Sequence, residues 1–290
     1  MNSYRLEKKK SVKAGTFALL AGVALLLGTA TTASAQDDNT GTNPINFTYD
    51  ARFYMEMSDL AALNGSALTQ TFEFRAPLGR TLTNLAPENL GLFSDLGSKY
   101  ALRVKFRNKS LSFDDAEGSA FGSSSVSGIG DLDVRFLAVP YVNQKYAVAT
   151  GVEAYFPTAT NDALGTGRVA VVPQIFFGFF GVLGGRSMFV PGYLYVADAG
   201  GDDDRTKLSQ HKIDVYFVWL LADMKNWLII NPQANFDTGN DQNIFLVDAE
   251  FGFMIPPVPG ASTYLRPGVG FGDDKPFDWT FEFGLKFIWR

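Results

Sequence analysis

The C-terminal segment of the chain alternates between large apolar side chains and charged or small ones. The apolar positions are Trp279, Phe281, Phe283, Leu285, Phe287 and Trp289. The intervening positions are Asp278, Thr280, Glu282, Gly284 and Lys286. Successive side chains of a β-strand point to opposite faces, so this alternation predicts an amphipathic strand with one fully apolar face.

The same period-two pattern recurs along the chain and predicts about twelve strands. They cover residues 45–57, 69–78, 99–112, 128–141, 145–157, 167–180, 186–197, 210–222, 226–237, 243–255, 262–271 and 277–289. Membrane-spanning strands need about 9–11 residues, whereas strands of water-soluble proteins have about 5–6. The lengths therefore favour an all-β fold, an antiparallel up-and-down transmembrane β-barrel. A periplasmic β-sandwich remains the less favoured alternative.

The connections between these strands alternate in length and charge. Short turns are expected at 143–144, 181–185, 223–226 and 256–261. Longer, mostly acidic loops are expected at 114–127, 159–167, 198–209, 237–242 and 272–276. Bacterial barrels have short periplasmic turns and longer extracellular loops, so the alternation supports a barrel with both termini in the periplasm. The long segment 79–98 is the exception, and it either holds a short helix or folds into the lumen.

The first 35 residues have the three parts of a secretory signal peptide. A basic start precedes an apolar run, Phe17 to Ala30, and the small residues Ala33-Ser34-Ala35 offer a cleavage site. A membrane anchor would need about 20 apolar residues. We therefore expect a cleaved signal over 1–35, a flexible N-terminus over 36–44 and the barrel over 45–290. No cysteine is present to carry a lipid anchor.

Removal of the signal makes the protein strongly acidic. The chain has 25 basic and 30 acidic residues, and the expected signal contains five of the basic residues and one of the acidic ones. The remaining chain has 20 basic and 29 acidic residues, a formal charge of −9. This balance argues against a nucleic-acid partner. The absence of cysteine excludes disulfides and thiol chemistry.

The sequence offers little that resembles catalysis or metal binding. The one histidine, His211, lies two residues from Ser209, but no Gly-x-Ser-x-Gly motif accompanies them. The runs 202–204 and 273–274 are acidic, yet they lack the spacing of a calcium loop, and solvated loops explain them better. We therefore expect no catalytic, cofactor or metal site, and a protein that is not an enzyme.

Three central motifs resemble the meta-pathway phenol-degradation family of outer-membrane proteins. They are Ser127-Gly-Ile-Gly-Asp-Leu-Asp-Val-Arg135, Gly151-Val-Glu-Ala-Tyr-Phe-Pro-Thr158, and Leu164-Gly-Thr-Gly167 followed by Pro173. The similarity covers residues 127–290, and Ala159 departs from the glycine usual in that family. The resemblance implies an outer-membrane barrel that transports hydrophobic or aromatic compounds, and it carries over no binding residues.

The charged side of the strands should face the lumen, because a charge on the lipid side is costly. The residues expected to line a pore are Arg103, Lys105, Arg107, Asp131, Asp133, Arg135, Glu153, Asp214, Asp248, Glu250, Arg266 and Glu282. Two functions stay open: a channel for small solutes, or a closed structural or surface-interaction barrel. The expected partners are small solutes, outer-membrane lipid, lipopolysaccharide and the barrel-assembly machinery.

Overall fold

The computed structural model describes residues 49–61, 65–78, 100–113, 125–221, 225–256 and 258–289. The expected signal peptide, the expected flexible N-terminus and the segment 79–98 lie outside these ranges. Among the described residues, no helix is both long enough and apolar enough to cross a membrane.

Thirteen strands and one short 3-10 helix make up the described chain. The elements in order are β1 (Tyr49–Leu60), β2 (Gly65–Pro77), β3 (Tyr100–Phe113), β4 (Ser125–Ile129), β5 (Leu132–Val142), β6 (Tyr146–Phe156), η3 (Asp162–Leu164), β7 (Arg168–Phe180), β8 (Ser187–Gly201), β9 (Ser209–Leu220), β10 (Asn226–Asp237), β11 (Gln242–Met254), β12 (Ala261–Phe271) and β13 (Trp279–Trp289). The strand positions expected from the alternation are confirmed to within a few residues at each end.

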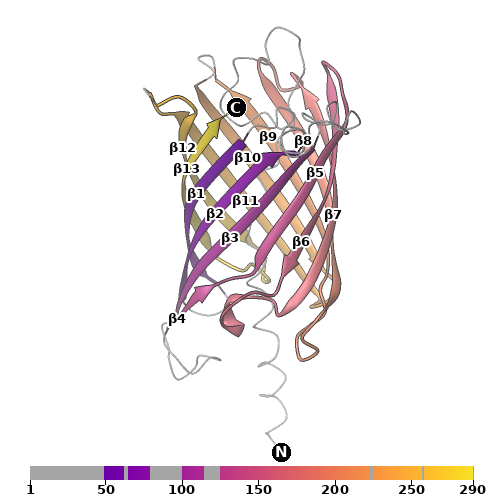
Figure 1. The fold of residues 1–290 in the computed structure, drawn as a ribbon, viewed down its shortest axis with the longest axis vertical. Coiled ribbons are helices and arrows are strands. Elements are labelled where there is room, and N and C mark those ends of the chain that lie inside the picture. Colours follow the sequence, from indigo (N-terminus) through magenta and orange to yellow (C-terminus); the bar gives the residue numbers. More distant parts are fainter. Residues whose placement is uncertain are drawn as a thin grey trace, which may run out of the picture.

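The strands close into a barrel (Figure 1). Except for β4 and β5, which do not pair with each other, the strands pair antiparallel with their sequence neighbours. Strand β13 pairs with β1, from Tyr49 opposite Trp289 to Ser58 opposite Thr280. Strands β4 and β5 both pair with β3, so the thirteen strands fill twelve positions around the barrel. The predicted antiparallel twelve-strand barrel is thus confirmed. Because the last strand pairs with the first, neither β1 nor β13 is left as an unpaired edge.

The single strand expected over 128–141 is wrong in one respect, because β4 and β5 are separated by Gly130 and Asp131. Ile129 pairs with Asn108, and Asp133 pairs with Lys105. Between these two pairs the β4–β5 segment has one more residue than β3. Such a β-bulge shifts which side chains face inward. It turns Asp131 into the interior, where it is buried.

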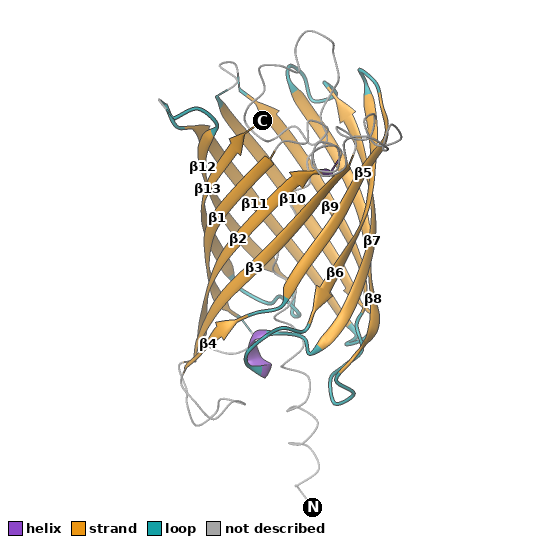
Figure 2. Cartoon of the chain, viewed as in Figure 1, coloured by secondary structure: helices purple, strands orange, loops and turns teal. Residues whose placement is uncertain are grey.

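The two ends of the barrel differ (Figure 2). The turn end, uppermost in Figure 2, carries Tyr49, Trp289 and the connections 143–145, 181–186 and 255–260. The opposite loop end carries the connections 157–167, 202–208, 238–241 and 272–278. Among the described connections the alternation of short and long is confirmed except at 238–241, which is a tight turn and not a long loop. Most of the expected loop 114–127 and part of the expected turn 223–226 lie outside the described residues.

The outer and inner faces are chemically opposite on most strands. Large apolar side chains such as Phe72, Phe106 and Phe251 are more than half exposed on the outside. Their sequence neighbours, such as Glu73, Lys105 and Glu250, are buried on the inside. The charges that alternation assigned to the interior therefore lie there.

Candidate functional site in the barrel lumen

All twelve expected pore-lining residues lie on the inner face of the barrel wall. Ten of them are buried, and Asp248 and Arg266 are partly exposed toward the lumen. The barrel wall is a single β-sheet. Its inward side chains are therefore buried by other inward side chains and not by a second layer of secondary structure. The structure gathers these residues into two charge clusters, with Asp131 and Asp214 apart from both.

The first charge cluster lies on β3, β5 and β6. Arg103 donates to Glu153 at 2.6 Å and lies 3.4 Å from Asp133. Arg107 also donates to Asp133, and Arg135 donates to Glu153. Two carboxylates therefore form ion pairs with three guanidinium groups, and these pairs link the three strands β3, β5 and β6.

The first cluster extends onto β1 and β2 through residues absent from the sequence-based set. Lys105 Nζ lies 3.3 Å from Glu73, and Arg52 lies 3.7 Å from the same carboxylate. Arg52 and Arg75 both bind Asp50, at 2.7 and 2.9 Å. The alternation of Asp50, Arg52, Glu73 and Arg75 with the outward phenylalanines of β1 and β2 could have predicted their inward position. The result is a continuous band of ion pairs along one half of the interior.

The second charge cluster lies on β11, β12 and β13 around Arg266. Its guanidinium group binds Glu250, lies 3.1 Å from Glu282 and lies 3.9 Å from Asp248. The Tyr264 hydroxyl donates to Glu282 at 2.7 Å. One arginine thus faces three carboxylates, so the second charge cluster has more negative than positive charge.

Asp131 serves a different purpose from the other inward carboxylates. It accepts hydrogen bonds from Thr166 N at 2.7 Å, Thr166 Oγ1 at 3.0 Å and Ala159 N at 3.3 Å. Lys109 Nζ donates to the Leu164 carbonyl at 2.9 Å, and the Leu164 side chain is fully buried. Asp131 and Lys109 therefore hold the β6–β7 connection, including η3, against the loop end of the inner wall.

The acidic loop 202–208 is tied to the barrel by Arg168 and Asp198. Arg168 donates to Asp198 at 2.6 and 2.8 Å, and to the Asp202 carbonyl at 2.6 Å. The Asp198 carboxylate also accepts from Leu208 N at 3.1 Å, so it holds the far end of the loop as well. Among the residues that the structure describes, no three His, Asp or Glu side chains lie close enough together to hold a metal ion.

The histidine and serine considered for catalysis do not contact each other. His211 Nδ1 lies 2.7 Å from the Tyr193 hydroxyl on the outer face of the barrel. The Ser209 hydroxyl shares a hydrogen bond of 2.7 Å with Thr238. The arrangement lacks the base-to-nucleophile contact that a serine hydrolase needs.

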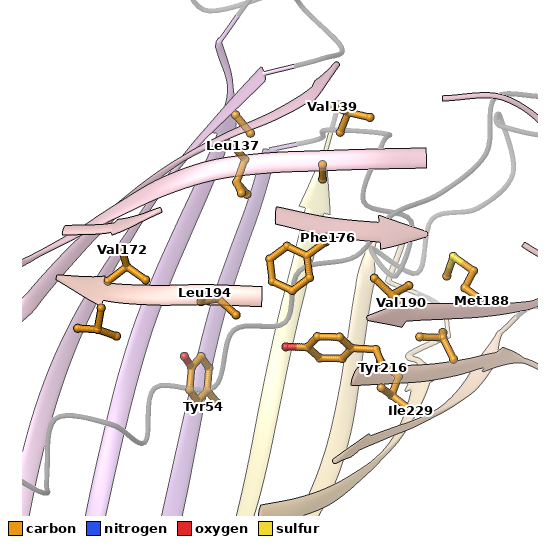
Figure 3. Packing of buried hydrophobic residues seen from close by; sticks show 14 of the residues in the cluster. Tyr54, Leu137, Val139, Val172, Phe176, Met188, Val190, Leu194, Tyr216 and Ile229 are labelled. Atoms are coloured by element: carbon orange, nitrogen blue, oxygen red, sulfur yellow. The ribbon is translucent and has the colours of Figure 1, made fainter. Parts of the chain in front are cut away.

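A large part of the inner wall is apolar, which the sequence pattern did not indicate. Figure 3 shows Phe176, Val190, Leu194 and Tyr216 among the side chains of this apolar wall. Its buried residues on β7, β8 and β9 are Ala170, Val172, Phe176, Met188, Val190, Leu194, Val196, Tyr216 and Val218. Strands β7 and β8 are apolar on both faces, so their alternation is weak and gave no signal. The lumen therefore has a charged side and an apolar side.

Comparisons with known proteins identify relatives of the fold. No family model matches the chain, and no curated protein matches it. An outer-membrane channel from Pseudomonas putida F1 matches with a TM-score of 0.61 and 14% identity, over 84% of this chain and 96% of that one. The NanC porin matches with a TM-score of 0.52 and 9% identity, over 82% of this chain and 98% of that one. The chain thus shares the barrel fold of outer-membrane channels.

Proposed function

We propose that the protein is an outer-membrane channel that passes small solutes through its lumen. The exposed apolar outer face suits a lipid bilayer, since a cation there would cost about 2–4 kcal/mol at mid-membrane. The signal peptide expected over 1–35 would direct the chain across the inner membrane. Lipid and lipopolysaccharide would surround the barrel after its insertion by the barrel-assembly machinery.

The observation that carries the proposal is a set of inward polar atoms that have no hydrogen-bond partner within the described part of the chain. They are Arg75 Nε, Arg103 Nε and Nη1, Arg135 Nη1, and both amide atoms of Gln174 and Asn235. A buried polar atom left without a hydrogen bond costs about 1–3 kcal/mol. These atoms are closed off from solvent in the present arrangement, so side-chain movement toward lumenal water would be needed to satisfy them, and a hydrated lumen is what a channel requires.

The two sides of the lumen suggest which solutes pass. The charge clusters favour water and ions, whereas the apolar wall offers a surface for hydrophobic groups. We infer that small amphipathic solutes, including aromatic ones as implied by the family resemblance, fit this combination. The channel function of the structurally similar proteins points the same way.

A closed barrel with a structural role is the second candidate. The ion pairs of the first charge cluster favour it, because paired side chains occupy space in a lumen that twelve strands keep narrow. Flux into liposomes separates the two functions. The purified, folded protein should admit small sugars and amino acids into liposomes. Liposomes as impermeable as protein-free ones would favour the closed barrel.

A further inference from the structure

A hollow in the inner wall near the loop end combines four polar side chains with an apolar border. It is partly open, and the space of about 360 Å³ outside the protein atoms includes solvent in front of the hollow. Its lining residues are Lys212, Asp214, Gln233, Ala234, Asn235, Ile244, Leu246 and Pro276. Neither charge cluster includes any of the four polar residues at 212, 214, 233 and 235, which we call the polar patch.

Strand register explains how the polar patch forms. Lys212 and Asp214 are two residues apart on β9, so both face inward. Asn235 of β10 lies opposite Lys212, and Gln233 lies opposite Asp214. Directly opposite residues have Cβ atoms about 4.5–5.5 Å apart. The four side chains therefore form a square with one cation, one anion and two carboxamides.

Apolar residues border the square on both sides. On the β8 side, Leu194 lies opposite Lys212. On the β11 side, Ile244 lies opposite Asn235 and Leu246 lies opposite Gln233. A few convergent polar groups within an apolar border are typical of small-molecule sites.

Asn235 is the residue that most clearly lacks a partner. The residue is 7% exposed, and neither Nδ2 nor Oδ1 has a hydrogen-bond partner among the described residues. Gln233 Nε2, by contrast, donates to Asn231 at 2.7 Å and to Asp248 at 2.8 Å. Asn235 thus presents a donor and an acceptor to whatever fills the hollow.

The two charges of the patch attract each other, but they do not form a direct ion pair. Within the part of the chain that the structure describes, Lys212 takes part in no ion pair. Asp214 accepts only a long hydrogen bond of 3.4 Å from the Tyr216 hydroxyl. A ligand that carries both charges would satisfy both residues, whereas a simple anion would leave Asp214 unsatisfied and a simple cation would leave Lys212 unsatisfied.

We propose that the polar patch binds the zwitterionic head of an α-amino acid with an apolar side chain. The ligand carboxylate accepts hydrogen bonds from Lys212 Nζ and Asn235 Nδ2. The ligand ammonium group donates to the Asp214 carboxylate and to Asn235 Oδ1. The apolar side chain of the ligand lies against Ile244 and Leu246. This site would be a binding station within the channel, so the inference rests on the proposed function.

Calorimetric titration of the purified full-length barrel in detergent tests the site with three probes of similar apolar shape. L-Leucine carries both charges, 4-methylpentanoate lacks the ammonium group and 3-methylbutylamine lacks the carboxylate. Loss of one charge partner leaves a polar group unsatisfied, so each analogue should bind about tenfold more weakly, or worse. Equal affinity for the three probes, or no affinity for leucine, would overturn the assignment.

Variants then locate the binding. Lys212→Gln, Asp214→Asn and Asn235→Leu should each weaken leucine binding about tenfold. Lys145→Gln is the matched control, because Lys145 lies in an exposed turn at the opposite end of the barrel. Each variant is first shown to migrate as a folded, heat-modifiable barrel. Unchanged leucine affinity in the three folded variants would also overturn the proposal.

The salt conductance of the same preparation keeps this inference separate from the channel function. A conducting barrel that does not bind leucine contradicts the amino-acid site alone. A barrel that binds leucine through these residues but does not conduct contradicts the channel function and supports the site.

Discussion

The phenyl ring of Phe176 on β7 lies directly over Gly192 on β8. The two residues are paired in register, and a Cβ built on Gly192 would lie 2.1 Å from two ring atoms. The same contact recurs twice. Trp227 covers Gly252 and Tyr264 covers Gly284, with built Cβ distances of 1.9 and 2.2 Å. At three places an inward aromatic ring is thus held flat against the wall by a glycine.

Replacement of Gly192 should therefore narrow the lumen. In Gly192→Val the new side chain occupies the place of the ring, and Phe176 must rotate toward the lumen. We expect a lower single-channel conductance with the barrel still folded. The double variant Phe176→Ala with Gly192→Val should recover most of the conductance. A Gly192→Val barrel that conducts like the parent protein would contradict this role of the pair.

Neutralisation of Arg103, Lys105 and Arg107 by glutamine should shift ion selectivity toward cations. Asp133 would then lose both of its ion-pair partners, whereas Glu73 and Glu153 would each keep one, Arg52 and Arg135, so the lumen would carry an excess of negative charge. The shift is measured as the reversal potential under a potassium chloride gradient.

The reciprocal variant serves as the control for selectivity. Glutamine at 73 and 153 with asparagine at 133 should shift the reversal potential toward anions. The triple cation variant should also unfold at a lower temperature, since an uncompensated buried charge costs about 3–5 kcal/mol. A conducting pore whose reversal potential does not move would exclude these residues from the ion path.

Asp131→Ala should release the β6–β7 connection from the inner wall. The change removes three hydrogen bonds to one carboxylate, each worth about 1.5–3 kcal/mol because the acceptor is charged. The chain has no cysteine, so Ala163→Cys introduces a single reporter in η3 that is buried in the parent. Its rate of labelling by a polar maleimide should rise about tenfold or more in the Asp131→Ala background.

A cysteine at position 182, in an exposed turn at the other end, provides the control for labelling. Its rate should be the same in the parent barrel and in the Asp131→Ala background. A reporter at 163 that labels equally slowly in both backgrounds would show that Asp131 does not hold the connection.

Deletion of residues 287–290 should prevent stable insertion of the barrel. Phe287 pairs with Ala51 of β1 and with Ala261 of β12, so the deletion removes part of the closing seam. Unpaired backbone groups would then face lipid, which is strongly unfavourable. We expect loss of heat-modifiable migration, whereas deletion of Arg290 alone should preserve it. Normal migration of the longer truncation would refute the importance of the seam.

The sequence predicted the strands well because two independent signals agreed. Period-two alternation placed apolar and charged residues on opposite faces, and segment length separated membrane strands from shorter ones. The interior position of Arg103 and Glu153 followed from alternation alone. Their contact did not, because these residues are 50 positions apart and meet only through the register of β3, β5 and β6.

Other parts of the site gave weaker signals or none. The inward Gln174 lies on β7, where apolar residues occupy both faces and hide the alternation. The bulge at Gly130 and Asp131 shifts the inward set by one residue, which no periodic pattern predicts. The polar patch was visible as polar positions on β9 and β10. Its square arrangement required the pairing of those two strands.

Single-channel recording tests the central claim most directly. The purified barrel, folded as judged by heat-modifiable migration, is added to a planar lipid bilayer in potassium chloride. We expect discrete conductance steps whose reversal potential depends on the charges at 103, 105 and 107. Repeated insertion of folded protein without any conductance step would contradict an open lumen and favour the closed structural barrel.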